Sequence, residues 1–285
     1  MMESPLGPGM RALAGLLESR TGQTLSEGRR WRLETSLRPV LKAHKLANLD
    51  GLAAAIMADQ NGPLAQAAVD ALLNNETCFF RDAHMFRMVA NDLFPALMTA
   101  ERRGKEAKTL HLWCAGCSTG QEVYSLAMLF QNHQDRWPGW RLRILATDIS
   151  TEAIGRARSG LFLQSEVQRG LPINDLLRWF EPDGEQWRIH QTLRDMIDFR
   201  VENLFDDISP RGPYGIAFCR NVLLYFSTER KDRLLHILSR HLVGGGHLLL
   251  GAGETVIGQR SEFVASHRFR GAYERAGPPP PGPIL

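Results

Sequence analysis

The segment Leu110–Phe130, which reads LHLWCAGCSTGQEVYSLAMLF, decides the fold class. Its first part is apolar up to Cys114 and predicts a buried strand, whereas the residues after Gly120 have the apolar spacing of a helix. Between these parts, Gly116 and Gly120 permit positive φ angles and a close approach of the backbone, and the start of the helix offers unpaired amide donors. The order of strand, glycine turn and helix therefore predicts a nucleotide-type pocket.

Further short apolar runs continue this pattern, with helical patterns between several of them. Strands that alternate with helices pair in parallel and form a layered α/β sheet. The runs that predict its strands are 109–114, 142–147, 196–201, 215–219 and 247–250. Residues 160–194 break this rhythm, because they are longer than a crossover needs and contain the turn signal Pro182-Asp-Gly184. They predict a small inserted β element.

The remaining segments suggest the domain organisation. Residues 10–98 are rich in Ala and Leu with helical spacing, which predicts an N-terminal all-helical domain and a linker. The α/β domain then occupies residues 99–276. Pro39 is expected to kink its helix or to restart it. Residues 277–285 are dominated by proline and predict a disordered tail.

Composition excludes several classes of protein. With 285 residues, of which 44% are hydrophobic, the chain can bury a full core and form one large and one smaller domain. A net charge of +3 is too small to indicate a nucleic acid as the partner. The sequence has no apolar run long enough to span a membrane and no signal-peptide pattern, so we expect a cytoplasmic protein. Nothing in it demands more than a monomer.

The four cysteines are too few for a disulfide scaffold. Cys114 and Cys117 form a CxxC motif, but no second pair and no matching pair of histidines accompanies it. The sequence therefore predicts buried, reduced thiols and no metal site.

One segment is strongly basic. Between Gly28 and Leu46 the only acidic residue is Glu34. The basic residues of this stretch are Arg29, Arg30, Arg32, Arg38, Lys42 and Lys45. Such a cluster predicts either a docking surface for an acidic partner or only a solvated helix face.

Polar residues also follow the predicted strands. Asp148 ends the strand in LRILATDIS, where α/β folds place an acid that accepts ribose hydroxyls. The alternative is that Asp148 only caps the helix that begins near Thr151. Arg220 and Asn221 interrupt FCRNVLLYF (Phe218–Phe226) at a strand's carboxyl end, which is where open parallel sheets bind ligands.

A further mixed cluster, NNETCFFRD, covers Asn74–Asp82. Asn75, Thr77 and Arg81 could line a pocket, whereas Phe79 and Phe80 alone would suggest core residues, and Arg81 with Asp82 a surface pair. The cluster therefore predicts part of a site only in combination with the others.

These four clusters together resemble one family, the bacterial chemotaxis receptor methyltransferases known as CheR. The resemblance includes Asn-x-Thr-x-Phe-Phe-Arg, Trp-x-Ala-x-x-Ser-Thr-Gly-x-Glu-x-Tyr-Ser, Thr-Asp-Ile and Phe-x-Arg-Asn-Val-x-x-Tyr-Phe, in the family's order. The matching residues are Asn75–Arg81, Trp113–Ser125, Thr147–Ile149 and Phe218–Phe226. The similarity extends from about Leu13 to Tyr273.

The resemblance implies a Rossmann-like S-adenosylmethionine-dependent methyltransferase sheet with an N-terminal helical domain and a small inserted β-subdomain. It implies S-adenosyl-L-methionine as the cofactor and S-adenosyl-L-homocysteine as the product. The implied cofactor contacts are Asn75, Thr77, Arg81, Glu122, Asp148, Asn203, Leu204, Arg220 and Asn221.

Each implied residue type suits a task. Arg81 can pair with the methionine carboxylate, Glu122 can accept from the ammonium group, and Asp148 can accept the ribose hydroxyls. Asn203 can present an amide to the adenine. Arg220 and Tyr225 are expected nearest the reacting groups, with Arg220 steering the substrate carboxylate.

The family's substrates are glutamates on acidic methylation helices of chemoreceptors, which a basic surface formed by Arg29, Arg30, Arg38, Lys42 and Lys45 would attract. Two features depart from the family's common form. After the last predicted strand, the family frequently has Gly-His-Ser-Glu, whereas this chain has Gly251-Ala-Gly-Glu254. The turn of the inserted element is also shorter than in family members that bind a receptor's C-terminal pentapeptide. We therefore expect no pentapeptide tether.

Two other functions stay open from the sequence. A nucleotide-dependent oxidoreductase is disfavoured, because Gly116 and Gly120 do not have the G-x-G-x-x-G spacing. A catalytically silent signalling module that keeps the cofactor pocket is compatible with the altered segment at Gly251–Glu254.

Overall fold

The computed structural model describes residues 7–24, 31–101, 108–206 and 212–276. The chain divides into two compact units. The helical unit contains the residues up to Asn74 together with Tyr225–Arg230, and the α/β unit contains Asn75–Leu224 and the residues from Lys231 onward. Within the described residues, no helix is both long and apolar enough to cross a membrane.

The described residues up to Asn74 form four helices, and local sequence signals mark several of their ends. Proline occupies a first-turn position of α1 (Pro8–Thr21) and α4 (Pro63–Leu72), where its missing N–H costs no hydrogen bond. The side chain of Asn48 caps α3 (Leu49–Ala58) by accepting from the amide of Gly51 at 2.9 Å. The core of the unit consists of aliphatic side chains with helical spacing, namely Leu13, Leu17, Leu33, Leu37, Leu52, Ile56, Ala65, Ala68 and Val69.

Pro39 does not restart its helix, so that one of the two sequence-based expectations is wrong, whereas a kink at Pro39 stays a prediction. Helix α2 (Trp31–Ala43) is continuous with Pro39 inside it. Proline removes one helical hydrogen bond, but Leu37 and Val40 on either side are buried and hold the helix against the core. Tertiary packing therefore overrides the local preference.

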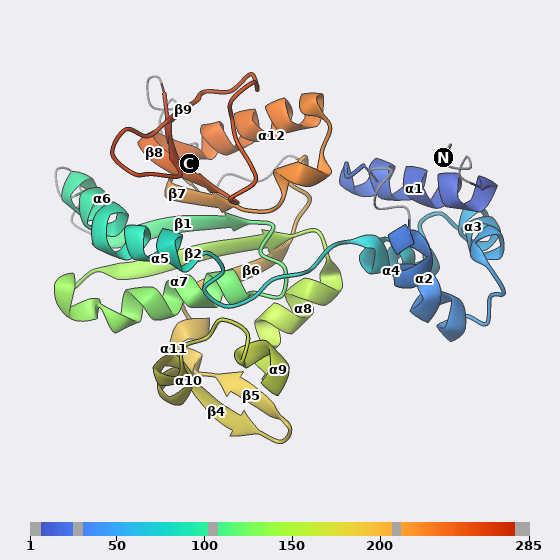
Figure 1. Ribbon diagram of the computed structural model, residues 1–285, viewed down its shortest axis with the longest axis horizontal. Coiled ribbons are helices and arrows are strands. Elements are labelled where there is room, and N and C mark those ends of the chain that lie inside the picture. The colour runs from blue at the N-terminus through green and yellow to red at the C-terminus, as the bar shows by residue number, and fades with distance from the viewer. Residues whose placement is uncertain (1–6, 25–30, 102–107, 207–211, 277–285) are drawn as a thin grey trace. The chain divides into compact units, whose positions relative to one another are not determined.

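The α/β unit is built on a seven-stranded sheet in the order β6-β2-β1-β7-β8-β10-β9 (Figure 1). The first five strands in this order are mutually parallel. Strand β10 pairs antiparallel with β8, and β9 pairs antiparallel with β10. Their bounds are β1 Thr109–Ala115, β2 Arg141–Asp148, β6 Ile197–Val201, β7 Tyr214–Cys219, β8 Leu242–Leu250, β9 Phe263–Ala265 and β10 Ala272–Arg275. All five predicted strands are present, and the parallel α/β fold is confirmed.

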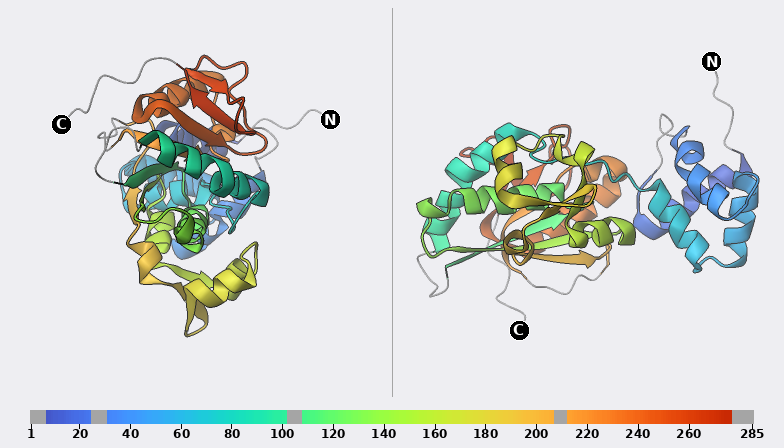
Figure 2. Two further views of the ribbon diagram at one scale, coloured as in Figure 1. Left: turned by 90° about the vertical axis from the view of Figure 1, so that its left-hand side faces the viewer. Right: turned by 90° about the horizontal axis from the view of Figure 1, so that it is seen from below.

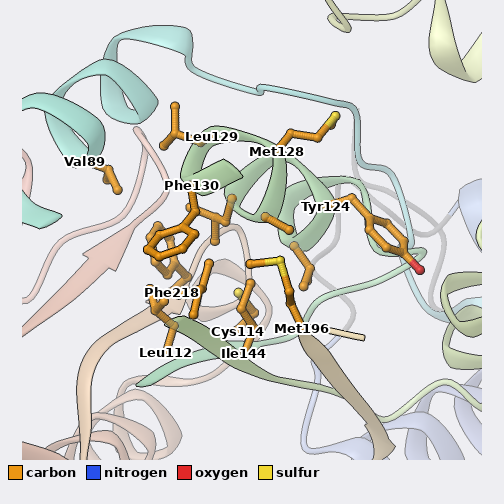
Figure 3. Packing of buried hydrophobic residues seen from close by; sticks show 14 of the residues in the cluster. Val89, Leu112, Cys114, Tyr124, Met128, Leu129, Phe130, Ile144, Met196 and Phe218 are labelled. Atoms are coloured by element: carbon orange, nitrogen blue, oxygen red, sulfur yellow. The ribbon is translucent and has the colours of Figure 1, made fainter. Parts of the chain in front are cut away.

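Helices cover both faces of this sheet. Alternate residues of β1 point to opposite sides, so Leu112 and Cys114 join the core beneath α7 (Gln121–Asn132). Figure 3 shows these side chains together with Phe218 of β7 and Phe130 of α7. Trp113 points the other way, and its ring lies 5.4 Å from that of His241, the last residue of α12 (Thr228–His241). Strand β7 and the carboxyl-terminal halves of β1 and β2 are therefore buried on both faces.

The chain divides at Asn74 rather than near residue 98. Residues 83–101 are helical, as predicted, and consist of α5 (Ala83–Met88), a π-helical turn (Val89–Leu93) and α6 (Phe94–Glu101). Their apolar side chains nevertheless pack in the core of the α/β unit. The ring of Phe94, for example, lies 6.2 Å from that of Phe130 and 6.0 Å from that of Trp137. Helical spacing alone does not show which core a helix joins.

A separate three-stranded antiparallel sheet lies between β2 and β6 in the chain, following α8 (Thr151–Ser159). Its strand order is β3-β5-β4, and β4 and β5 form a hairpin that projects from the main body of the α/β unit (Figure 2). The elements of this insertion are β3 Leu161–Leu163, α9 Gln164–Val167, α10 Ile173–Trp179, β4 Phe180–Asp183, β5 Gln186–Ile189 and α11 Gln191–Arg194.

Candidate functional site

The predicted cofactor residues gather at one edge of the main sheet. The chain passes from β1 to β2 on one side and later returns to β7 on the other side of β1, so the direction of winding reverses between β1 and β7. Open α/β sheets bind ligands at the carboxyl ends of their strands next to such a reversal. The glycine loop follows β1, Asp148 ends β2, Asn203 follows β6 and Arg220 follows β7.

The glycine loop is shaped by two glycines with positive φ. Gly116 has φ +82°, and a Cβ atom on it would lie 2.5 Å from Cγ2 of Val222 in the loop after β7. Gly120 has φ +91°, and its Cβ would lie 3.0 Å from Cβ of Ala157. Gly116 therefore allows the loops after β1 and β7 to approach, and Gly120 allows close packing against α8 at the N-cap of α7.

Asp148 links this loop to the end of β2. Its Oδ2 accepts from the amide of Ser118 at 2.8 Å, and its Oδ1 accepts from the amide of Ser150 at 2.9 Å. Ser150, and not Asp148, caps α8, because the Ser150 hydroxyl accepts from the amide of Ala153 at 3.1 Å. The alternative that Asp148 serves only as the helix cap is therefore wrong. Each carboxylate oxygen can accept a second hydrogen bond, as a ribose diol would require.

The segment Asn75–Asp82 is attached to the site by two serines that belong to the family motif but received no role from the sequence. The hydroxyl of Ser118 donates to the carbonyl of Asn75 at 2.8 Å, and the amide of Phe80 donates to the hydroxyl of Ser125 at 3.0 Å. Ser118 also has a positive φ of +51°. Serine in Cys-Ser-Thr-Gly is ambiguous in sequence, since hydroxyls frequently bond only to their own turn.

Arg81 stands between two residues of left-handed conformation, Phe80 at φ +48° and Asp82 at φ +64°. Its only hydrogen bond within the described chain is a long one of 3.4 Å to the carbonyl of Glu76. The expected alternative of a surface pair between Arg81 and Asp82 is not found, because the Asp82 carboxylate pairs instead with Arg220. The guanidinium of Arg81 is therefore available to an anionic group.

Arg220 lies at the centre of a buried charge cluster. Its side chain is 1% exposed, and its two terminal nitrogens contact different carboxylates. Nη1 donates to Oε2 of Glu122 at 2.5 Å, and Nη2 donates to Oδ2 of Asp82. Burial raises the pKa of Glu122 above its ordinary value, although the nearby Arg220 and, more weakly, Arg81 act in the opposite direction. These contacts indicate that Arg220 orients Glu122 and Asp82 more than it faces a substrate.

The loop after β7 is fixed by Glu254. Its Oε2 accepts from the amides of Asn221 at 2.6 Å and Gly251 at 2.8 Å, and its Oε1 accepts from the amide of Leu224 at 3.2 Å. Asn221 has a positive φ of +60°. A Cβ on Gly251 would lie 2.8 Å from both the Asn221 side-chain nitrogen and Glu254 Oε2. Glu254 therefore joins the loops after β7 and β8.

Asn203 and Leu204 lie directly beyond β6. Oδ1 of Asn203 accepts from the amide of Phe205 at 3.1 Å, which makes a tight turn, and Leu204 is 7% exposed. Thr77 is half-buried in the segment before α5. The apolar side chain of Leu204 and the polar groups of the turn at Asn203 together suit contact with a flat heterocyclic ring such as a nucleobase.

Tyr225 belongs to the helical unit and not to the unit that holds Arg220. Its hydroxyl accepts from the side chain of Asn74, and its carbonyl accepts from the amide of Thr24 at 2.8 Å. The expected pairing of Tyr225 with Arg220 near the reacting groups stays a prediction.

Of the predicted docking residues, Arg29 and Arg30 lie outside the described residues. Arg38 and Lys42 are exposed on α2, and Lys45 is exposed two residues beyond its end. Among the described residues, none of these three has an ion-pair partner.

Three of the four cysteines are buried as predicted, whereas Cys78 is only half-buried. All four are free, and Cys114, Cys117 and Cys219 are buried. Burial raises the pKa of each of these three thiols well above its ordinary value, so they are protonated near neutral pH.

The site as a whole suits a nucleoside that carries an amino-acid group. Oε1 of Glu122 has no partner among the described residues and can accept from an ammonium group, while Arg81 can pair with a carboxylate. Nε of Arg220 is also buried without a partner there, so an acceptor on a ligand would satisfy it. Asp148 can then accept from a ribose at the next strand.

Comparison with known proteins identifies this arrangement. A family model described as CheR methyltransferase, SAM binding domain, matches residues 75–270. Over 256 residues the chain is 35% identical to a chemotaxis protein methyltransferase of Vibrio parahaemolyticus and 34% identical to chemotaxis protein methyltransferase 1 of Vibrio cholerae, each match covering 89% of this chain and 91% of the relative. A chemotaxis protein methyltransferase of Pseudomonas putida is 34% identical over 247 residues, covering 85% of this chain and 88% of that protein. The chain therefore belongs to the CheR methyltransferase family and is an S-adenosylmethionine-dependent methyltransferase of chemotaxis.

Proposed function

We propose that the protein methylates side-chain carboxylates of glutamates on the acidic cytoplasmic helices of chemoreceptors. It would act as a monomer in the cytoplasm and without gripping a receptor's C-terminal pentapeptide. The relatives' names support methylation in chemotaxis. The observation that carries the choice of an acidic helix as substrate is the exposed basic surface of α2, formed by Arg38 and Lys42 with Lys45 beyond it.

The cofactor residues are proposed to act as follows. Arg81 binds the methionine carboxylate, Oε1 of Glu122 accepts from the ammonium group and Asp148 accepts the ribose hydroxyls. Asn203 and Leu204 contact the adenine. Asn75, Thr77 and Asn221 complete the lining. This division is supported by the positions of the groups at the ends of successive strands and by the partners that Glu122 and Arg81 lack.

Methyl transfer to a carboxylate requires no proton transfer by the protein. When bound, S-adenosylmethionine supplies an electrophilic methyl group on a positively charged sulfur. A glutamate carboxylate, with an ordinary pKa of about 4.3, is already ionised near neutral pH and needs no general base. The burden on the residues is therefore to position the acceptor and exclude water, which in well-oriented reactions provides about 7–11 kcal/mol.

Arg220 is proposed to contribute to this positioning through Glu122, since both of its terminal nitrogens are occupied by carboxylates and its side chain is buried. Tyr225 remains the candidate for contact with the acceptor. A Tyr225→Phe variant tests this by separating the two parameters: we expect kcat to fall while the Kd of the cofactor stays unchanged.

The inserted sheet supports methylation without a pentapeptide. Peptides dock on sheet edges by forming main-chain hydrogen bonds. Strand β4 is an edge of this sheet, but Pro182 within it offers no amide donor. The hairpin also exposes Glu181, Asp183 and Glu185, and only Asp183 has an ion-pair partner among the described residues, Arg188. Exposed carboxylates disfavour a peptide that ends in its own carboxylate.

Incubation with methyl-labelled S-adenosylmethionine and receptor-containing membranes tests the proposal. We expect methyl incorporation that is lost in mild alkali, because esters hydrolyse in base and N-methyl groups do not. Label that survives alkali would refute carboxyl methylation. Absence of label with every receptor, together with normal cofactor binding, would favour a catalytically silent sensor.

Charge reversal tests the docking surface. Arg38→Glu with Lys42→Glu should slow methylation of intact receptors and leave the Kd of the cofactor unchanged. Lys108→Glu with Arg270→Glu is a matched control, because it changes the net charge equally at exposed positions of the α/β unit. Equal slowing by both pairs, or equal slowing on a short peptide substrate, would contradict docking through α2.

Binding measurements test the pentapeptide prediction. Titration with peptides that match receptor C-termini should show no saturable binding to this protein. Saturable binding that shifts resonances or protection in β4 would refute the prediction.

A further inference from the structure

We propose that Asp82 is a positioning residue for the amino-acid end of the cofactor, and that it acts through Arg220. It holds one arm of the Arg220 guanidinium, so that the other arm fixes a single oxygen of Glu122 and leaves the second oxygen for the ammonium group. The inference rests on the proposed role of Glu122 and adds Asp82, which sequence alone suggested only as the surface partner of Arg81.

The conformation of Asp82 is the first observation. It occupies the N-cap position of α5, where an aspartate ordinarily accepts from a backbone amide of the first turn. Its side chain makes no such bond. The residue instead adopts a left-handed conformation of φ +64°, which is uncommon for a residue with a side chain, and its carboxylate contacts a residue 138 positions away. Asp82 therefore contacts Arg220 instead of forming the helix-capping hydrogen bond that its position would favour.

The geometry of Arg220 is the second observation. An arginine and a single carboxylate pair best in a bidentate manner, with two parallel N–H···O bonds. Here the guanidinium is divided between Glu122 and Asp82, one terminal nitrogen to each. If Asp82 were absent, the freed Nη2 of Arg220 could turn to Oε1 of Glu122. The acceptor that the ammonium group needs would then be occupied by the protein itself.

The charge of the cluster is the third observation. Asp82, Glu122 and Arg220 together carry a formal charge of −1, which one ammonium group neutralises. Without Asp82 the remaining pair is neutral. The Arg220 side chain is 1% exposed and that of Glu122 15%, so this charge is only weakly screened at the point where the ammonium would bind. The Asp82 side chain is 44% exposed, which reduces its direct attraction and leaves its hold on Arg220 as the main effect.

The experiment compares two ligands that differ only in the amino-acid group. S-adenosylhomocysteine carries the ammonium and carboxylate, whereas 5′-methylthioadenosine has the same nucleoside and sulfur without them. For Asp82→Asn, calorimetry should show a Kd for S-adenosylhomocysteine raised about tenfold, the effect of losing one charged hydrogen bond. The Kd for 5′-methylthioadenosine should change less than about twofold, because no interaction with the nucleoside is removed.

Two variants control the result. Asp82→Glu keeps the charge and should recover part of the lost affinity, whereas Asp92→Asn removes an exposed carboxylate from the nearby π-helical turn and should change neither Kd. Equal weakening of both ligands in Asp82→Asn would show a merely structural role and overturn the inference, as would no change in either.

The variant Glu122→Gln separates this inference from the proposed function. If Glu122→Gln weakens only S-adenosylhomocysteine and Asp82→Asn does not, the proposal for Asp82 alone is refuted. If Glu122→Gln also fails to discriminate between the two ligands, the assignment of Glu122 to the ammonium group is refuted and the inference falls with it.

Discussion

Replacement of Glu254 should loosen the cofactor crevice without touching the cofactor itself. The carboxylate accepts three backbone amides from the loops after β7 and β8, at 2.6, 2.8 and 3.2 Å. Glu254→Ala removes all three acceptors. Glu254→Gln keeps one oxygen, which can retain the two shorter bonds to Asn221 and Gly251 if the amide group points its oxygen toward them.

The structure sets the size of the effect. A hydrogen bond to a charged group contributes about 1.5–3 kcal/mol when desolvated, and the half-buried position of Glu254 favours the lower end of that range. Water can replace part of the loss at the exposed amide of Leu224. We therefore expect Glu254→Ala to lower the free energy of unfolding by about 3 kcal/mol and Glu254→Gln by about 1 kcal/mol. For a unit of this size, those losses correspond to melting temperatures lower by about 6–12 °C and 2–4 °C.

Thermal unfolding and cofactor titration together test this reasoning. The loop that Glu254 fixes contains Asn221, so the Kd for S-adenosylhomocysteine should rise in Glu254→Ala, and saturating ligand should recover part of the lost melting temperature. Glu262→Ala serves as a control, because the Glu262 side chain pairs with His236 of α12 and not with the loop after β7. An unchanged melting temperature and Kd in Glu254→Ala would refute the claim that this carboxylate anchors the loops.

Three further outcomes are expected. Burial raises the pKa of Glu122, and a bound ammonium group would lower it, so binding of S-adenosylhomocysteine should release protons. Binding should therefore weaken on acidification at a pH where an ordinary glutamate is still charged. Calorimetry in buffers of different ionisation enthalpy measures the proton release, and Glu122→Gln should abolish the release. Gly116→Ala should destabilise the protein by about 2 kcal/mol through its φ of +82° and its contact with Val222, and Val222→Ala should restore part of the loss in a double-mutant cycle. Gly170→Ala should weaken cofactor binding, because its Cβ would lie 2.1 Å from the carbonyl oxygen of Phe79; equal Kd values for this variant and the wild type would contradict it.

The sequence predicts the five parallel strands because each contains a short apolar run, although exposed polar residues such as Arg143 of β2 and Asp198 of β6 interrupt some of them. It does not predict β9 and β10, since Val264 and Glu274 are exposed in these short strands at the edge of the sheet, and their apolar runs are too brief to show a period. The family resemblance then supplies the cofactor and the order of the motifs, which composition and spacing alone do not give.

The sequence indicates residues that the structure brings to the carboxyl edge of the sheet, but not the contacts between them. Asp148, Glu122 and Arg220 follow strands or begin a helix, and such positions can be read along the chain. That Asp82 contacts Arg220 and not the adjacent Arg81 depends on the left-handed backbone at Asp82 and on a contact across 138 positions. Local preferences favour a helix cap or a surface pair there, so only the folded chain reveals the pairing.

Contacts between residues far apart in the chain also explain why the α/β unit begins at Asn75. These contacts join the segment after Asn74 to the inserted sheet. Phe79 is buried with its ring 5.0 Å from that of Phe162 in β3 and 5.7 Å from that of Phe180 in β4. The carboxylate of Glu76 pairs with Arg169 of the insertion at 2.6 Å. The segment that presents Arg81 is therefore packed against the inserted sheet as well as the main one. Tightly packed side chains transmit displacements to their neighbours. A shift of the insertion would therefore move the segment that contains Arg81 and would alter the affinity for the cofactor. On the proposed role of Arg81, the inserted sheet would help to position the residue that binds the cofactor's carboxylate, and this would require no receptor peptide at its outer edge.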